Sequence, residues 1–222
     1  FLSILSHELR TPLNGIKGFS EIMLLDPSSL SENYREFLGL INECGCKLGA
    51  IVDELLRFVE FYSDMDEPEE LDIRLDHLVE QVLDTLSEKI STKDIRVSVT
   101  AQAHMPVVHG KNEHFFEIFK QILDNAVKFS PHHGKVEVLL ETTPEAFRFI
   151  CRDQGKGIPE KDLEQVFDSF YQVEDYSTRT QDGLGLGLTI AKKIIELYQG
   201  TIGISSRPDI GTTVSVTLPR PS

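Results

Sequence analysis

His7 and Glu8 are adjacent residues that could support nucleophilic catalysis. They lie in a stretch whose apolar residues recur every three and four positions, the spacing of a helix that packs along one stripe. His7 lies off that stripe, so its imidazole should face water. Neutral imidazole is a good nucleophile, and a neighbouring carboxylate can hold its N–H and stabilise the imidazolium. Pro12 should bend the helix and bring Glu8 toward the ring. The alternative is a surface histidine on a coiled-coil helix.

Asn125 lies on the polar face of an amphipathic helix predicted over residues 112–129. Gln121 precedes it by one turn, and Lys128 follows three residues later on the same side. An amide oxygen can ligate Mg²⁺ while the metal keeps water and phosphate oxygens as its other ligands, and a lysine can neutralise a phosphate. The alternative is a solvated polar helix face.

Asp153 comes at the end of a predicted strand and is followed by Gly155 and Gly157. The two glycines permit a close backbone approach and unusual dihedral angles. A carboxylate beside them could accept a hydrogen bond from an exocyclic amine such as that of adenine. The alternative is a tight turn capped by the aspartate.

Gly183, Gly185 and Gly187 alternate directly before a helix predicted over residues 186–198. Their amides and the helix N-terminus would form an anion site suited to phosphates. Their spacing differs from the dinucleotide fingerprint, and no Gly-Lys-Ser/Thr sequence closes a P-loop. A flexible hinge is the alternative.

The motifs described above resemble those of two known protein families. The sequence from His7 to Leu13 resembles the phosphoacceptor box of sensor histidine kinases at all seven positions, and the later motifs resemble the ATPase superfamily of gyrase, Hsp90, histidine kinases and MutL. The resemblance implies that ATP is bound by the following residues, with Asn125 as the Mg²⁺ ligand: Asn125, Asp153, Gly155, Gly157, Gly183, Gly185, Gly187 and Thr212. Lys128, on the face of Asn125, and Arg179 are candidate phosphate contacts. It also implies a lid over the nucleotide at residues 171–182. Gln121 departs from the pattern, which usually has a second asparagine at this position.

The same resemblance implies autophosphorylation of His7, with Glu8 as the base or orienting group, followed by transfer to an aspartate of a response-regulator receiver domain. Thr11 lies on the face of His7, one turn later, and the Glu8-to-Thr11 pattern resembles one associated with phosphatase activity toward the regulator. Two other functions remain open, a degenerate binding scaffold and a plain ATPase of the same superfamily.

Net charge, hydropathy and cysteine content exclude several classes of protein. The chain has 222 residues and a net charge of −14, which argues against a nucleic-acid groove or a site for anionic lipid. No apolar run reaches the roughly 20 residues needed to span a bilayer. The three cysteines suggest reduced thiols in a cytoplasmic protein. We expect a fragment that begins inside a helix, with any sensor or membrane anchor upstream.

The elements expected to position these residues form an α+β protein with two domains, residues 1–65 and 66–222, separated by an acidic stretch. The first should be a hairpin of two amphipathic helices that pairs with a second copy as a four-helix bundle, so a homodimer is expected. Packing against the C-terminal domain is the alternative. The second domain should be an α/β two-layer sandwich. Its predicted helices cover residues 77–90, 112–129, 163–167 and 186–198, and its strands cover 71–75, 95–100, 136–142, 147–153, 201–205 and 213–218. Residues 107–110 are expected to form a short strand or a turn.

Overall fold

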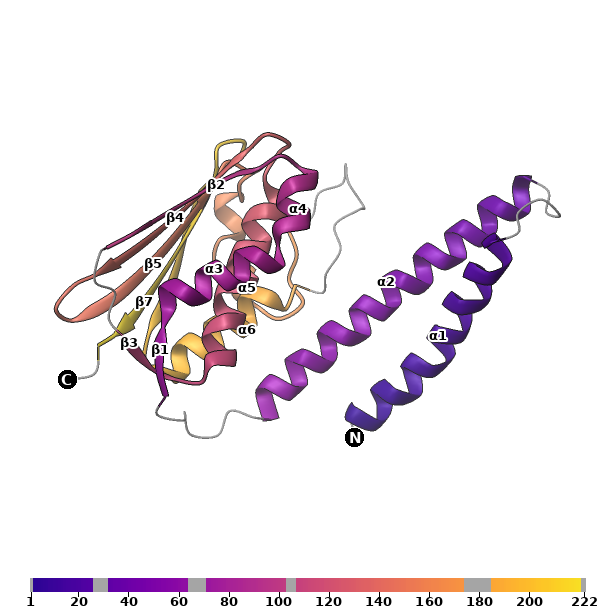
Figure 1. Cartoon of the computed structure of the whole chain (residues 1–222), viewed down its shortest axis with the longest axis horizontal. Helices are drawn as coiled ribbons and strands as arrows, with labels where there is room; N and C mark the ends of the chain where they lie inside the picture. The colour runs from indigo at the N-terminus through magenta and orange to yellow at the C-terminus, as the bar shows by residue number, and fades with distance from the viewer. Residues whose placement is uncertain (1, 26–31, 64–70, 103–106, 174–184, 221–222) are drawn as a thin grey trace. The chain divides into compact units, whose positions relative to one another are not determined.

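The computed structural model describes residues 2–25, 32–63, 71–102, 107–173 and 185–220. The helical hairpin up to Asp64 belongs to one compact unit, and the mixed α/β residues Met65–Glu174 and Gly187–Ser222 form a second. Figure 1 shows the helices and strands of both units. The functional assignment of residues 1–65 and 66–222 as separate domains stays a prediction.

The hairpin consists of α1 (Leu2–Leu25) and α2 (Glu32–Ser63). Leu13 of α1 and Val52 of α2 are each 5% exposed and form its small apolar interior. Ser20 donates a hydrogen bond to the carbonyl of Lys17 and accepts one from the amide of Asn42 at 3.1 Å. The helix α1 is continuous across Pro12, and the bend expected there stays a prediction.

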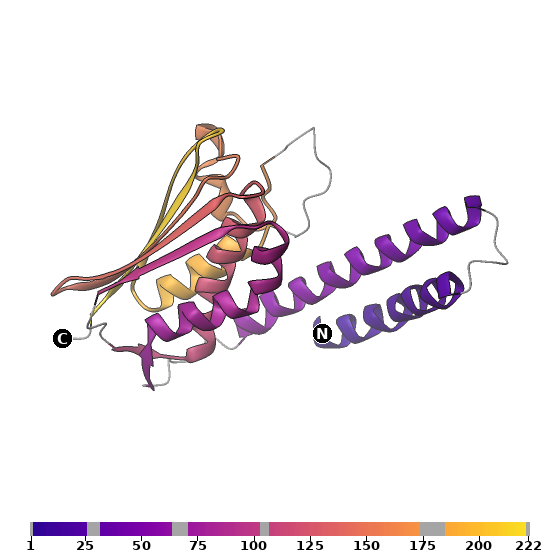
Figure 2. The ribbon, with the colours of Figure 1, turned by 45° about the horizontal axis from the view of Figure 1, so that its top comes forward.

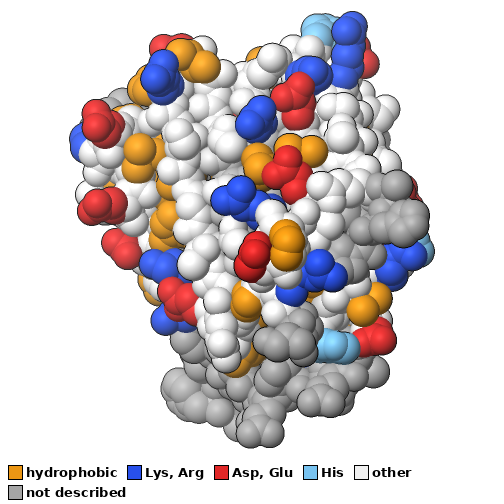
Figure 3. Space-filling model, turned by 90° about the vertical axis from the view of Figure 1, so that its left-hand side faces the viewer, with side chains coloured by type: hydrophobic (Ala, Val, Ile, Leu, Met, Phe, Trp, Pro, Cys, Tyr) orange, Lys and Arg blue, Asp and Glu red, His pale blue; other side chains and the backbone are white. Residues whose placement is uncertain are grey.

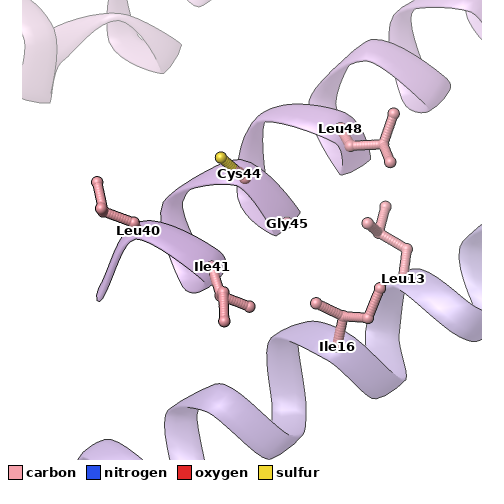
Figure 4. A pocket seen from close by; sticks show the side chains of 7 residues that line it. All are labelled: Leu13, Ile16, Leu40, Ile41, Cys44, Gly45 and Leu48. Carbon is pink, nitrogen blue, oxygen red and sulfur yellow. The ribbon is translucent and has the colours of Figure 1, made fainter. Parts of the chain in front are cut away.

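Much of the apolar stripe on both helices is uncovered within the hairpin. Phe19 is 71% exposed and Phe37 is 58% exposed. Figure 4 shows a shallow apolar groove on this surface, lined by Leu13, Ile16, Leu40, Ile41, Cys44, Gly45 and Leu48. Among the described side chains, the predicted seam is therefore only partly covered by the contact between α1 and α2.

The α/β unit contains a five-stranded sheet in the order β2-β4-β5-β7-β6. Only the pair of β2 and β4 is parallel, and the other neighbours are antiparallel. A separate two-stranded antiparallel sheet joins β1 and β3. The strands are β1 (Leu71–Arg74), β2 (Arg96–Ala101), β3 (Val107–Gly110), β4 (Lys135–Thr142), β5 (Ala146–Asp153), β6 (Thr201–Arg207) and β7 (Gly211–Pro219).

The helices of this unit cover one face of the large sheet, as Figures 1 and 2 show. They are α3 (Leu75–Thr85), α4 (Ser87–Thr92), α5 (Asn112–Phe129) and α6 (Gly187–Leu197), with short 3₁₀ turns η2 (Glu160–Asp162) and η3 (Gln165–Phe167). The α/β two-layer sandwich expected from the sequence is confirmed. The opposite face carries charges of both signs with hydrophobic side chains between them (Figure 3).

The core lies between α5, α6 and the covered face of the sheet. Alternate residues of β4 and β5 are buried, and the ring of Phe119 from α5 packs against that of Phe149 from β5 at 4.8 Å. Phe115 packs against Tyr198 near the end of α6, with ring centroids 4.6 Å apart. Burial of these large apolar side chains is the main interaction that fixes α5 on the sheet.

The single helix predicted over residues 77–90 is wrong, because α3 and α4 are separate helices that meet at Leu86. The hydroxyl of Thr85 donates to the carbonyl of Val82 at 2.7 Å, an acceptor that it shares with the N–H of Leu86 at 3.2 Å. A threonine hydroxyl that competes in this way loosens the helix. Leu86 itself is 4% exposed, so apolar burial holds the break in place.

Candidate functional site

Asp153 is at the centre of the nucleotide site predicted from the sequence. The antiparallel register of β5 and β7 places the end of one strand beside the start of the other. Oδ1 of Asp153 consequently accepts hydrogen bonds from the backbone N–H of Gly155 at 2.8 Å and of Thr212 at 3.2 Å. Within the described part of the chain, Oδ2 receives no hydrogen bond from the protein, and no buried side-chain oxygen lacks a partner. Oδ2 is therefore an accessible acceptor.

The electrostatics of Asp153 follow from its half-buried position. Burial raises the pKa of its carboxyl above the ordinary aspartate value, while the N–H donors of Gly155 and Thr212 act in the opposite direction. The two amide donors orient the carboxylate as well, because they fix Oδ1 and thereby the direction of Oδ2. Such an oriented acceptor in a partly desolvated place can discriminate between donors and acceptors on a ligand.

Two glycines after Asp153 permit tight backbone packing. Gly157 has a φ of +69°, and a Cβ there would lie 2.0 Å from the carbonyl oxygen of Arg207. A Cβ on Gly155 would lie 2.6 Å from the carbonyl oxygen of Phe129, the last residue of α5. Glycine is needed at both positions, and the second contact seats the Asp153 turn against the end of α5.

Asn125 and Lys128 lie on the last two turns of α5, and both side chains are half-buried. The Nζ atoms of Lys128 and Lys156 lie 5.3 and 5.2 Å from the centroid of the Phe129 ring. Two lysines, one from α5 and one from the turn after Asp153, thus bring positive charge to the same end of the helix. This charge suits a phosphate-bearing ligand.

Lys93 holds the end of α5 by a contact that sequence reasoning missed. Its ammonium donates to the carbonyls of Val127 at 3.1 Å, Lys128 at 2.6 Å and Ser130 at 3.0 Å. These carbonyls include helix-terminal groups that lack intrahelical donors, and a cation there also complements the helix dipole. Burial lowers the pKa of Lys93. The residue is distant in sequence, so no local pattern could have indicated the contact.

Two further residues in this region were not assigned a role from the sequence. Asp124, next to Asn125, pairs with Lys89 of α4 at 2.5 Å, so its carboxylate ties α4 to α5. Ser206 of β6 accepts from the N–H of Ile158 at 2.8 Å and donates to the carbonyl of Gly211 at 2.8 Å. Its hydroxyl also lies 2.9 Å from that of Thr212, which fixes the strand beside Asp153.

The glycine-rich motif is described only in part. Gly185 has a φ of +73°, and Gly187 is the first residue of α6. A Cβ on Gly187 would lie 2.2 Å from Oε1 of Gln121, so the start of α6 adjoins the helix that carries Asn125. Arg179, Gly183 and most of the proposed lid lie outside the described residues.

His7, Glu8 and Thr11 lie in α1, where the structure describes the helical backbone but not their side chains. They belong to the hairpin, whereas Asn125, Asp153 and Thr212 belong to the α/β unit. The structure therefore brings the end of α5 beside the Asp153 turn, whereas the nucleotide-binding role of these residues and the pairing of His7 with Glu8 stay predictions.

Two family models and several known proteins match this chain. Residues 1–61 match the model of the His Kinase A (phospho-acceptor) domain, and residues 110–222 match that of the histidine kinase-, DNA gyrase B- and HSP90-like ATPase. Sensor histidine kinase AruS of Pseudomonas aeruginosa is 37% identical over 219 residues, which is 96% of this chain. The chain spans 22% of the length of AruS.

Solved structures show the same arrangement of elements. Full-length ShkA in complex with AMPPNP matches 98% of this chain and 45% of its own with a TM-score of 0.75 and 26% identity. Histidine kinase ThkA in complex with response regulator protein TrrA matches 99% of this chain and 60% of its own with a TM-score of 0.68. At 23% identity, that second likeness concerns the fold alone.

No helix in the described ranges is both long enough and apolar enough to cross a membrane.

The phosphoacceptor match over the hairpin and the ATPase match over the α/β unit account together for most of the sequence. The chain therefore belongs to the sensor histidine kinases and contains the phosphoacceptor helices and the ATP-binding domain of that family.

Proposed function

We propose that this chain is the catalytic core of a homodimeric protein-histidine kinase that phosphorylates His7 with ATP and then phosphorylates a response regulator. The observation that carries the nucleotide part is the outward acceptor Oδ2 of Asp153, oriented by the two backbone donors on Oδ1. A hydrogen-bond acceptor at this position can bind the exocyclic amine of adenine. It would repel the carbonyl oxygen that guanine carries at the same place.

The residues around α5 fit the phosphates and their magnesium ion. Asn125 offers an amide oxygen, and Lys128 and Lys156 bring positive charge to the same helix end. Among the described residues there is no cluster of three or more histidine, cysteine or acidic side chains that could hold a metal. An ion at Asn125 would thus be shared with phosphate oxygens and water, as Mg²⁺ prefers, and would neutralise charge on the phosphates.

In the proposed reaction, an imidazole nitrogen of His7 attacks the γ-phosphorus of ATP. A nitrogen–phosphorus bond forms, the bond to the bridging oxygen breaks, and ADP leaves. Glu8 orients the imidazole and accepts the proton that its ring loses. The protein contributes mainly by positioning the two groups and by neutralising charge, which together provide most of the catalysis in phosphoryl transfer.

The partners follow from the hairpin and from the relatives. The exposed apolar residues of α1 and α2 form a surface that a second hairpin would cover, as in a four-helix bundle. The ThkA structure contains a response regulator, and an aspartate of such a receiver domain is the proposed acceptor for the phosphoryl group of His7. Sedimentation of the purified chain should give a dimer, and a monomer at micromolar concentration would contradict the proposed bundle.

Incubation with γ-labelled ATP tests the proposed function. The chain should become labelled, and the label should be labile to acid and stable to base, as expected of a phosphohistidine. His7→Ala should lose the label and keep its affinity for ATP, because the two sites lie in different units. Release of free phosphate without a labelled protein would instead indicate a plain ATPase, and absence of both would indicate a binding scaffold.

A further inference from the structure

Gly187 is a glycine that its own backbone conformation does not require. Its φ lies outside the left-handed region, unlike that of Gly185 at +73°. A Cβ on Gly187 would meet Oε1 of Gln121 at 2.2 Å, Cδ at 3.1 Å and Cγ at 3.7 Å, and these three atoms are its nearest neighbours. The space for a side chain at the start of α6 is thus occupied by one side chain from α5.

Gln121 is held in this position through its other amide atom. Nε2 donates to Oε1 of Glu117, one turn earlier on α5, at 2.5 Å. Glu117 is 5% exposed, and its second oxygen lies 3.8 Å from Nζ of Lys120. Because Nε2 of Gln121 donates to Glu117, the amide oxygen is the atom that faces Gly187.

We propose that Gln121, held by Glu117, is a positioning residue that sets the separation of α5 from the start of α6 and, while so held, fills the space that a Cβ at 187 would need. The position one turn before the magnesium ligand is where this sequence has glutamine and the family pattern has asparagine. The longer side chain reaches α6, and glycine at 187 accommodates it.

The consequence for nucleotide binding rests on the proposed function. Asn125 lies one turn after Gln121 on α5, and the first amides of α6 form the proposed phosphate site. Because Gln121 touches the first residue of α6, it fixes the distance between the metal ligand and the phosphate-binding amides. A shorter side chain would leave α6 free to shift relative to Asn125.

Thermal unfolding of the whole chain without nucleotide tests the contact through a double-mutant cycle. Gly187→Ala alone should lower the midpoint by about 3 °C or more, because the new Cβ displaces Gln121 from Glu117. In a Gln121→Ala background the same substitution should leave the midpoint unchanged or raise it, since alanine is the better helix former. An equal lowering in both backgrounds would overturn the proposal.

A matched control distinguishes relief of the contact between Gln121 and Gly187 from a general tolerance of alanine at glycine positions in the Gln121→Ala background. Gly155→Ala places a Cβ 2.6 Å from the backbone carbonyl oxygen of Phe129, which no truncation of Gln121 can relieve. Its penalty should therefore persist in the Gln121→Ala background. If Gly187→Ala alone fails to fold, recovery of folded protein in the double variant supports the pair, and failure of both variants to fold contradicts it.

The positioning role is tested by titrating AMPPNP and Mg²⁺ calorimetrically. Gln121→Ala should raise the Mg²⁺ concentration needed for half-maximal binding by about threefold to tenfold, and Gln121→Asn should raise it as well, because its side chain is one methylene shorter. An unchanged Mg²⁺ dependence in Gln121→Ala overturns the positioning role. If the unaltered chain binds no nucleotide, the proposed function fails, whereas the unfolding cycle still decides whether Gln121 and Gly187 are coupled.

Discussion

Replacing Asp153 with asparagine tests the role of Oδ2 while the role of Oδ1 is kept. The asparagine Oδ1 can still accept from the N–H groups of Gly155 and Thr212, which lie at 2.8 and 3.2 Å in the parent structure. Its NH₂ group then replaces Oδ2 and presents a donor where adenine also presents a donor. The variant should therefore keep the turn but lose the acceptor that reads the base.

The expected loss of ATP affinity follows from the loss of one charge-assisted hydrogen bond. Such bonds contribute about 1.5–3 kcal/mol net, which corresponds to a loss of roughly tenfold to 150-fold in affinity for ATP. The thermal midpoint should remain equal or rise, because burial disfavours the ionised carboxyl of Asp153 and asparagine carries no charge. GTP should lose less affinity than ATP, since the carbonyl of guanine can accept from the new NH₂ group.

Calorimetric titration with AMPPNP and a guanine analogue, together with thermal unfolding, provides the measurement. Asp153→Ala serves as the control, because it removes the acceptor for the two backbone donors and should lower the midpoint as well as the affinity. A loss of ATP affinity below about threefold in Asp153→Asn, with the midpoint unchanged, would show that Oδ2 does not face the base. Equal losses for ATP and GTP would show that Asp153 only shapes the turn.

Other predictions concern the metal, the helix end, pH and the phosphoacceptor helix. Asn125→Ala should remove the Mg²⁺ dependence of AMPPNP affinity, which calorimetry at varied Mg²⁺ will show. Lys93→Met leaves the carbonyls at the end of α5 without their ammonium donor and should lower stability by about 1–3 kcal/mol in denaturant unfolding. Because burial raises the pKa of Asp153, ATP affinity should begin to fall on acidification at a higher pH than for an ordinary aspartate, and Asp153→Asn should lack this pH dependence. Thr11→Ala should retain autophosphorylation but slow the loss of label from purified phospho-regulator, and an unchanged rate would exclude a phosphatase role.

The sign of the stability effect at Asp153 is opposite to that of a salt-bridged aspartate. Its pKa in the folded state is raised, so the folded chain binds this proton more tightly than the unfolded chain does. Ionisation of Asp153 consequently lowers the free energy of unfolding as pH rises through its raised pKa. The carboxylate is retained at a cost to stability, as is common for groups that act in binding.

Local sequence patterns alone predicted much of this fold. The bounds of α5 match the helix predicted over residues 112–129, because its apolar residues recur with a clear helical period and Pro131 follows its end. The alternation of β4 and β5 likewise predicted strands with one buried face. The position of Asp153 at a strand end beside two glycines was also predictable from the sequence, since turn residues and strand periods are properties of short segments.

Tertiary structure decided which atoms of the site meet. The neighbours of Asp153 depend on the pairing of β5 with β7, and Thr212 is 59 residues away in the chain. The support that Lys93 gives to α5 and the contact of Gln121 with Gly187 likewise join segments that no local period relates. The break between α3 and α4 was missed because the apolar spacing continues across Leu86, while the Thr85 hydroxyl competes for the Val82 carbonyl. Residue type and spacing determine which chemistry is available, whereas strand register and side-chain packing determine the contacts of each reactive atom.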